Sequence, residues 1–356
     1  MHADEASAQI NDPAHSDSSM DRTLAELIGQ YDLPSDWRAI QGPSGMNNTT
    51  RIIACSDGQF VLRIYNNHQN AKIVKLEHEV LQFLLRTGFS LKVPDPVTNR
   101  NGDTITVDSN GKLASLFRYI EGERPSVADL EQVESLGRAA GMLSGALEKL
   151  PAMEQTVAEY RPYYELAQAY EGWSDEAVLA LAYQAELPEE ALISISCVLA
   201  ARKQLQLKLT TLSRLPHQWI HGDLNASNAV AIGRRVTGIL DFEFCTIDLR
   251  AMEPAVAMVD FIRGDRTEAQ RIEAIERFAR GFGHERRLGV DETAALPDLM
   301  LLRMLDVFLH FAVRLSEGLD DSTVWIEQAK HADAVIGWVD RHRVQLHDMF
   351  RETMSE

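Results

Sequence analysis

The segment 219–243 constrains the fold of this chain more than any other stretch. Three polar residues stand out in it, Asp223, Asn228 and Asp241, each beside an apolar run that should fix its backbone. Moving a γ-phosphoryl group requires one carboxylate that orients the attacking hydroxyl, and oxygen ligands that hold Mg²⁺ against the phosphates. Asp223 fits the first role, and Asn228 and Asp241 fit the second. The spacing therefore indicates phosphoryl transfer.

Two short apolar runs inside this segment predict a β-hairpin. The runs 229–232 and 236–240 flank the turn sequence Gly-Arg-Arg at 233–235. Strands paired in this way would bring Asn228 and Asp241 side by side, so the metal site would form at the open end of the hairpin. The competing interpretation is a surface loop with ordinary Asp and Asn turn residues.

The segment 221–228, His-Gly-Asp-Leu-Asn-Ala-Ser-Asn, resembles the catalytic loop of the aminoglycoside phosphotransferase, choline kinase and homoserine kinase-like family. The segment 239–243, Ile-Leu-Asp-Phe-Glu, resembles that family's metal-binding segment. The resemblance implies an α+β, bilobal protein-kinase-like fold, with a small antiparallel β lobe that carries one helix and a larger, mainly helical lobe. It implies ATP and Mg²⁺ as cofactors, bound in the cleft. It also makes His221 a structural hydrogen-bonding residue and Asp223 the residue that orients the hydroxyl.

The same resemblance divides the chain. We expect a disordered acidic tail at 1–20, a nucleotide-binding β lobe with a leading helix at 21–119, a hinge at 120–123, and a catalytic and acceptor-binding helical lobe at 124–350.

A small-residue loop at 42–51 leads into a predicted hairpin and is suited to cover nucleotide phosphates. The related kinases carry Gly-x-x-Asn-x-Thr here, matched by Gly45, Asn48 and Thr50. Arg63 stands where the family places a strand-borne Lys that contacts the α- and β-phosphates. Homoserine kinase-like members also use Arg, and a guanidinium binds phosphate bidentately. The competing interpretation of Arg63 is a solvent-facing residue of an edge strand.

Apolar residues recur at helical spacing over 70–87. On this helix Glu77 matches the acidic partner that the family supplies to the strand cation, and Glu79 is the alternative. Three further strands are predicted after it, at 97–98, 104–107 and 113–119.

The break in pattern after the last of these strands resembles the hinge of the family. Adenine is expected against the backbone of Arg118, Tyr119 and Ile120, a contact that side-chain identities cannot confirm.

The region 151–215 should be helical and contribute to acceptor binding, but no single acceptor-binding residue can be named from its scattered aromatic and acidic side chains.

After the metal-binding segment, Asp248 is expected to brace the catalytic loop by accepting backbone hydrogen bonds. Glu253 stands where related sequences commonly have Asp, so its role stays open. Glu243 is a candidate for the metal shell or for contact with the acceptor.

The net charge and the cysteine content indicate which kinds of binding partner and which cellular location to expect. The net charge of −18 argues against nucleic acid, because binding to phosphate backbones depends on Lys and Arg clusters. An acidic surface would attract a cationic substrate, although acidity also keeps proteins in solution. Three widely spaced cysteines argue against a disulfide framework and favour a cytoplasmic location. With neither a signal peptide nor an uninterrupted apolar span, no membrane partner is expected.

The predicted reaction is ATP-dependent transfer of the γ-phosphoryl group to a hydroxyl of a small molecule of the amino alcohol, sugar or aminoglycoside type. Three alternatives stay open: a protein Ser/Thr kinase of the same fold, a kinase-like binding module without catalysis, and transfer of a nucleotidyl group. The intact set Asp223, Asn228 and Asp241 argues against the module. The acceptor and the oligomeric state cannot be deduced from the sequence.

Overall fold

The computed structural model describes residues 18–42, 48–66, 70–151 and 160–356. The chain forms two compact units. The first comprises Met1–Lys75 with Asp95–Tyr119, and the second comprises Leu76–Pro94 with Ile120–Glu356. Of the predicted acidic tail, residues 1–17 lie outside the described residues, and helix α1 begins at Ser18.

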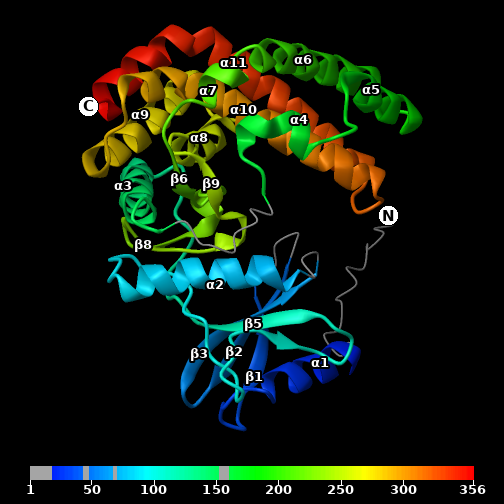
Figure 1. The fold of residues 1–356 in the computed structure, drawn as a ribbon, viewed down its shortest axis with the longest axis vertical. Coiled ribbons are helices and arrows are strands. Elements are labelled where there is room, and N and C mark those ends of the chain that lie inside the picture. The colour runs from blue at the N-terminus through cyan, green and yellow to red at the C-terminus, as the bar shows by residue number, and fades with distance from the viewer. Residues whose placement is uncertain (1–17, 43–47, 67–69, 152–159) are drawn as a thin grey trace, which may run out of the picture. The chain divides into compact units, whose positions relative to one another are not determined.

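An antiparallel five-stranded sheet, in the order β1-β2-β3-β5-β4, forms most of the first unit (Figure 1). The predicted strand at 97–98 is wrong: this segment is irregular, although the Val97 N–H donates to the Leu116 carbonyl. The elements are α1 Ser18–Ile28, β1 Arg38–Gln41, β2 Asn48–Cys55, β3 Gly58–Tyr65, β4 Thr106–Val107 and β5 Leu113–Arg118.

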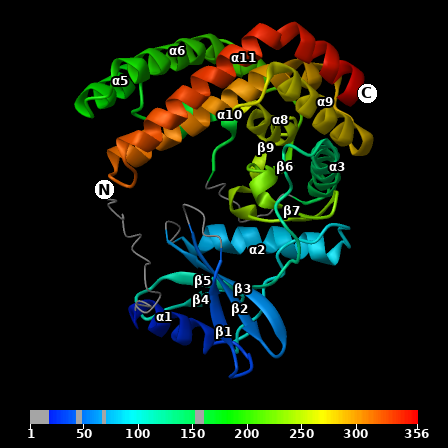
Figure 2. The same ribbon diagram turned by 180° about the vertical axis from the view of Figure 1, so that it is seen from behind.

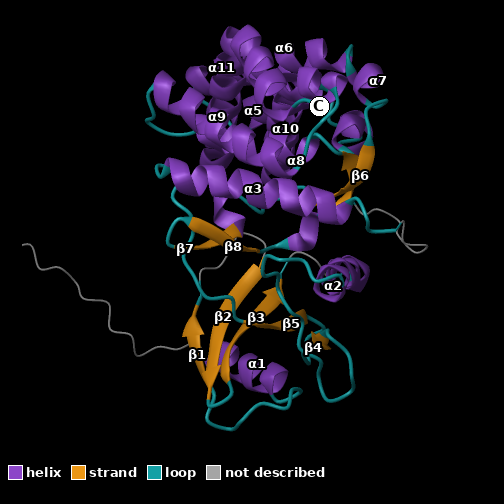
Figure 3. Cartoon of the chain, turned by 90° about the vertical axis from the view of Figure 1, so that its left-hand side faces the viewer, coloured by secondary structure: helices purple, strands orange, loops and turns teal. Residues whose placement is uncertain are grey.

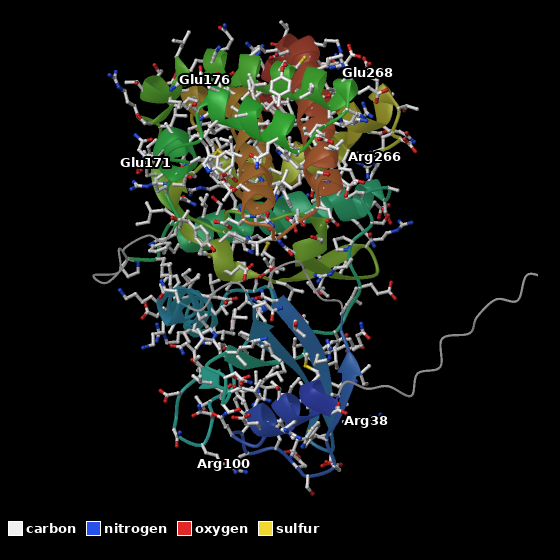
Figure 4. The ribbon with its side chains drawn as sticks, turned by 90° about the vertical axis from the view of Figure 1, so that its right-hand side faces the viewer. Arg38, Arg100, Glu171, Glu176, Arg266 and Glu268 are labelled. Carbon is white, nitrogen blue, oxygen red and sulfur yellow. The ribbon has the colours of Figure 1, made fainter. Side chains whose placement is uncertain are left out.

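Strand β1 was not predicted from the sequence, and the reason is physical. All four of its residues are exposed, so it lacks the apolar alternation by which strands are recognised. The core of the unit lies on the other strands, where Ile53, Leu62 and Leu116 pack with Leu27 of α1. Charged residues such as Arg100, which pairs with Asp32, lie at its surface (Figure 4).

Helices dominate the second unit, and α10 and α11 run side by side (Figure 2). Helices α3 and α9 pack closely because glycines face the contact: a Cβ on Gly137 would lie 2.1 Å from the Phe278 carbonyl oxygen. The helices are α2 Ala71–Arg86, whose first turn belongs to the first unit, α3 Leu130–Leu147, α4 Leu166–Ala169, α5 Asp175–Gln184, α6 Glu189–Gln206, α7 Leu209–Leu212, α8 Met252–Met258, α9 Glu268–Glu285, α10 Val290–Ser316 and α11 Ser322–Met354.

Two small antiparallel sheets carry the segment 217–249 within the second unit (Figure 3). One pairs β6, His217–Ile220, with β9, Thr246–Leu249. The other is the predicted hairpin, with β7 at Ala229–Ile232 and β8 at Arg235–Ile239. Within the described part of the chain, the helices are either too short or too polar to cross a membrane.

Candidate active site

The loop that follows β6 is built around His221. Its backbone N–H donates to Glu253 Oε2 at 2.6 Å, and its ring Nε2 lies 2.9 Å from the Leu240 carbonyl. The ring Nδ1 accepts from the Asp223 N–H at 3.3 Å. Burial lowers the pKa of His221 to about 4, so the ring is neutral near pH 7. The predicted structural role of His221 is confirmed.

Gly222 shapes the backbone just before Asp223. Its φ of +80° favours glycine, and a Cβ there would lie 2.8 Å from the Phe244 carbonyl oxygen. The carbonyl of Gly222 accepts a hydrogen bond from the Tyr163 hydroxyl at 2.8 Å. The backbone conformation of Gly222 therefore helps to fix the position of the next residue, Asp223.

Asp223 is held on both carboxylate oxygens. Asn228 Nδ2 donates to Oδ2 at 2.9 Å, and Arg303 Nη2 donates to Oδ1 at 2.5 Å. Burial raises the pKa of Asp223 to about 6, against the lowering effect of Arg303, and Asp241 and Asp260 raise it further. A carboxyl group with a pKa near neutrality can take up a proton during a reaction at physiological pH.

The hairpin brings the two predicted metal ligands together. The Leu240 N–H donates to the Asn228 carbonyl at 2.8 Å, which places the neighbouring Asp241 beside Asn228. Asp241 adopts a left-handed backbone conformation with φ 64° and ψ 65°, which is unusual for a residue other than glycine. Such conformations concentrate at functional sites.

Asn228 and Asp241 fit Mg²⁺ by the chemistry of their donor atoms. Asn228 directs its Nδ2 toward both the Asp223 carbonyl and the Asp223 carboxylate, at 2.9 Å each, so Oδ1 is the atom that would ligate a metal. Among the described residues, no group of three or more His, Cys, Asp or Glu side chains could hold a metal ion. A magnesium ion here would therefore need phosphate and water oxygens to complete its shell, as is typical of this ion.

Asp248 and Glu253 brace different segments from those expected. Asp248 accepts from the backbone N–H groups of Tyr163 and Leu249, each at 2.6 Å, and not from the catalytic loop. Glu253, fully buried on α8, accepts from the His221 N–H instead and so holds that loop. The prediction for Asp248 is thus wrong in its target, because β9 directs this side chain toward the segment that precedes α4.

Sequence reasoning missed Arg303 and Tyr163 as neighbours of Asp223. Arg303 Nη1 donates to the Tyr163 hydroxyl at 2.8 Å while Nη2 donates to Asp223. The available signal was the interruption of an apolar helix by charge: Arg303 lies between the buried residues Leu302 and Met304. A charge there requires a partner, but the sequence does not say which one.

Most of the expected nucleotide-binding residues lie in the first unit, whereas Glu77 and Ile120 belong to the second. Thr50 on β2 pairs with Arg63 on β3, and Asn48 pairs with Tyr65, while Gly45 lies outside the described residues. Since β3 is the central strand, the edge-strand interpretation of Arg63 is wrong. The Arg63 guanidinium carbon lies 5.6 Å from the ring centroid of Phe117.

Two backbone N–H groups of the predicted hinge region already donate hydrogen bonds within the chain. The Arg118 N–H donates to the Asp95 carbonyl at 3.0 Å, and the Tyr119 N–H donates to the Gln59 carbonyl at 3.1 Å. An adenine contact would therefore have to use the carbonyl groups of these residues or Ile120.

The structure separates the two acidic candidates on α2 by burial. The Glu77 residue is 1% exposed, whereas Glu79 is exposed. Glu243 is also buried, at 4% exposure. Two acidic residues of the predicted acceptor region, Glu171 and Glu176, are exposed at the surface (Figure 4).

Comparisons with known proteins agree on one family. The model of the phosphotransferase enzyme family matches residues 38–291. A homoserine kinase of Brucella anthropi is 28% identical over 297 residues, covering 80% of this chain and 83% of that protein.

Solved structures share the fold. The microcompartment-associated aminopropanol kinase has a TM-score of 0.70 and 18% identity, covering 92% of this chain and 98% of that chain. An amicoumacin kinase in complex with AMP-PNP and Ca²⁺ has a TM-score of 0.65 and 14% identity, covering 90% and 93%. The predicted α+β, protein-kinase-like fold is confirmed.

Proposed function

The chain belongs to the phosphotransferase enzyme family, and from this premise we propose that it transfers the γ-phosphoryl group of ATP to the hydroxyl of a small amino alcohol of the homoserine type. One observation carries the proposal: the carboxylate of Asp223 is held by Asn228 at 2.9 Å beside Asp241, at the open end of a hairpin. This is the arrangement that phosphoryl transfer requires.

In the proposed reaction, Asp223 accepts a hydrogen bond from the acceptor hydroxyl. The hydroxyl oxygen forms a bond to the γ-phosphorus, the bond from that phosphorus to the β–γ bridging oxygen breaks, and ADP leaves. The hydroxyl proton passes to the Asp223 carboxylate. Asn228 and Asp241 would hold Mg²⁺, which when bound would offset negative charge on the phosphates.

Most of the proposed nucleotide contacts come from residues of the first unit. Arg63, with Glu77 as its acidic partner, would position the α- and β-phosphates, and the loop with Gly45, Asn48 and Thr50 would cover them. The backbone of 118–120 would receive adenine. Support comes from the pairing of Thr50 with Arg63 on adjacent strands and from the burial of Glu77.

The proposed class of acceptor is based on the substrates named for two similar proteins. Homoserine and aminopropanol, the acceptors named for a relative and for a solved structure of the same fold, both carry an amino group and a hydroxyl. The net charge of −18 would attract an acceptor with a net positive charge, such as aminopropanol, and does not favour homoserine, whose carboxylate balances its ammonium group. We place the reaction in the cytoplasm, where ATP is available and free cysteines stay reduced.

The test is a panel of acceptors with [γ-³²P]ATP and Mg²⁺: homoserine, aminopropanol, choline, a sugar, an aminoglycoside and a generic protein. We expect label on an amino alcohol and release of ADP. Label on the protein would identify a protein kinase, and release of AMP with pyrophosphate would identify nucleotidyl transfer. Absence of transfer to every acceptor despite ATP binding would support a non-catalytic module.

A further inference from the structure

A residue far from the loop in sequence is bonded to the proposed catalytic carboxylate. Arg303, on α10, donates from Nη2 to Asp223 Oδ1 at 2.5 Å across 80 positions of sequence. We propose that Arg303 is a positioning residue that fixes the direction of the Asp223 carboxylate during phosphoryl transfer. This inference rests on the proposed function.

The two ends of the Arg303 guanidinium donate to two different residues, and Nη1 also lies 3.6 Å from Asp306 Oδ2. Nη2 donates to Asp223, and Nη1 donates to the Tyr163 hydroxyl at 2.8 Å. Because the guanidinium is planar and rigid, fixing one of these bonds fixes the direction of the other. The side chains of Arg303 and Asp223 are only 18% and 21% exposed, so water competes little for these bonds.

Tyr163 connects the same guanidinium to the loop backbone. Its hydroxyl donates to the Gly222 carbonyl at 2.8 Å, and its N–H donates to Asp248 Oδ2 at 2.6 Å. Arg303 is therefore linked to the loop twice, directly through the Asp223 side chain and through Tyr163 to the preceding residue. Both links oppose movement of the carboxylate relative to its own backbone.

The Asp223 carboxylate cannot turn freely between these donors. Asn228 holds Oδ2 while Arg303 holds Oδ1. Each carboxylate oxygen can accept more than one hydrogen bond, so the group remains able to accept from an acceptor hydroxyl. To orient a nucleophile, a carboxylate must be fixed in direction and must still be able to accept a hydrogen bond. The Asp223 carboxylate meets both conditions.

A second arginine on the same helix provides an internal comparison. Arg314 donates from Nε to Asp320 Oδ2 at 2.5 Å and from Nη2 to Oδ1 at 3.0 Å. Both side chains are 10% exposed, so this pair is at least as buried as that of Arg303. Its partner lies just beyond the end of α10, away from the loop 221–228, which makes Arg314 a matched control for the loss of a buried ion pair.

The experiment measures kcat and KM for ATP and for the best acceptor of the panel in R303M, R303K and R314M. We expect kcat of R303M to fall on the order of 10²-fold, as for a displaced catalytic group, with both KM values within about threefold of wild type. R303K should recover roughly tenfold of that loss, since it restores the charge but not the planar fork. R314M should keep the wild-type kcat.

Several outcomes would overturn the inference. They are an unchanged kcat in R303M, a rise in acceptor KM with kcat unchanged, and an equal loss of kcat in R314M. If R303M does not fold, Y163F decides, because it removes one arm and leaves every charge: we expect kcat to fall about three- to tenfold, and no change would refute the inference. Wild-type transfer with an unaffected R303M would refute only this inference, whereas a wild type that transfers nothing would refute the proposed function and this inference with it.

Discussion

Side-chain hydrogen bonds place the functional groups of the loop 221–228, whereas backbone pairing places those of the sheet in the first unit. Asn228 and Arg303 donate to the Asp223 carboxylate, and the His221 ring contacts the Leu240 carbonyl. Thr50 and Arg63 face each other because β2 and β3 pair in register. We conclude that single substitutions should have larger effects in the loop than in the sheet, where the backbone keeps its register after a side chain is changed.

The largest effect is expected at Asp241, whose carboxylate we assign to the metal. D241N should lower kcat on the order of 10³-fold, because a metal ion contributes several kcal/mol to charge stabilisation. Removal of divalent ions with a chelator should stop wild-type turnover. Rates measured against Mg²⁺ concentration test this, with the exposed Asp265 changed to Asn as the control. A D241N enzyme with wild-type rate and Mg²⁺ dependence would exclude the assignment.

Two buried carboxylates of the second unit should respond differently to the same chemical change. Asp248 uses both oxygens as acceptors, from Tyr163 and Leu249. In Glu253, by contrast, Oε1 has no hydrogen-bond partner among the described residues. D248N would therefore direct an amide N–H₂ at a backbone N–H and cost about 1–3 kcal/mol of folding stability, whereas E253Q should cost less than about 1 kcal/mol.

Urea unfolding of the D248N and E253Q variants checks this contrast. Equal losses of stability, or a larger loss in E253Q, would show that the two carboxylates are not distinguished by their hydrogen bonds.

A smaller effect is expected in the sheet. R63M should raise the KM for ATP roughly tenfold with little change in kcat, because the proposed charge-assisted contact with phosphate would be lost while the strands stay paired. The exposed Arg38 of β1 is a matched control, and R38M should behave as wild type (Figure 4). A fall in kcat of R63M as large as that of D241N would remove the proposed difference between the two regions.

A further prediction concerns the pH dependence of stability. Burial raises the pKa of Glu253 from 4.5 to about 7, so between these values the folded chain holds a proton that the unfolded chain has lost. Its contribution to stability is therefore present below about pH 4.5 and is lost as the pH rises through about 7. E253Q should lose less stability between pH 5 and pH 8 than wild type, measured by urea unfolding. Parallel pH profiles would contradict this assignment.

The sequence predicted the parts of the site that lie close together along the chain. The hairpin follows from local spacing and turn chemistry, whereas the structural role of His221 was implied by the family resemblance of the loop. The contacts from Arg303 and Tyr163 depend on how α10 and the segment before α4 pack against the loop. Long-range packing of this kind is not encoded in local periodicity.

The errors have a similar origin. Asp248 and Glu253 lie close in sequence, but β9 and α8 direct their side chains to different backbones. The exposed β1 carries no apolar alternation, and 97–98 is irregular in the structure. In each case the outcome depends on neighbours that the sequence does not identify.

The central claim is that Asp223 orients the acceptor hydroxyl, and the most direct measurement is single-turnover transfer by D223N, with ATP binding measured in parallel by calorimetry. The account predicts that D223N binds ATP as wild type does and transfers the phosphoryl group more than about 10²-fold more slowly, the range for loss of a general base. A D223N enzyme that transfers phosphoryl within about threefold of the wild-type rate would contradict it.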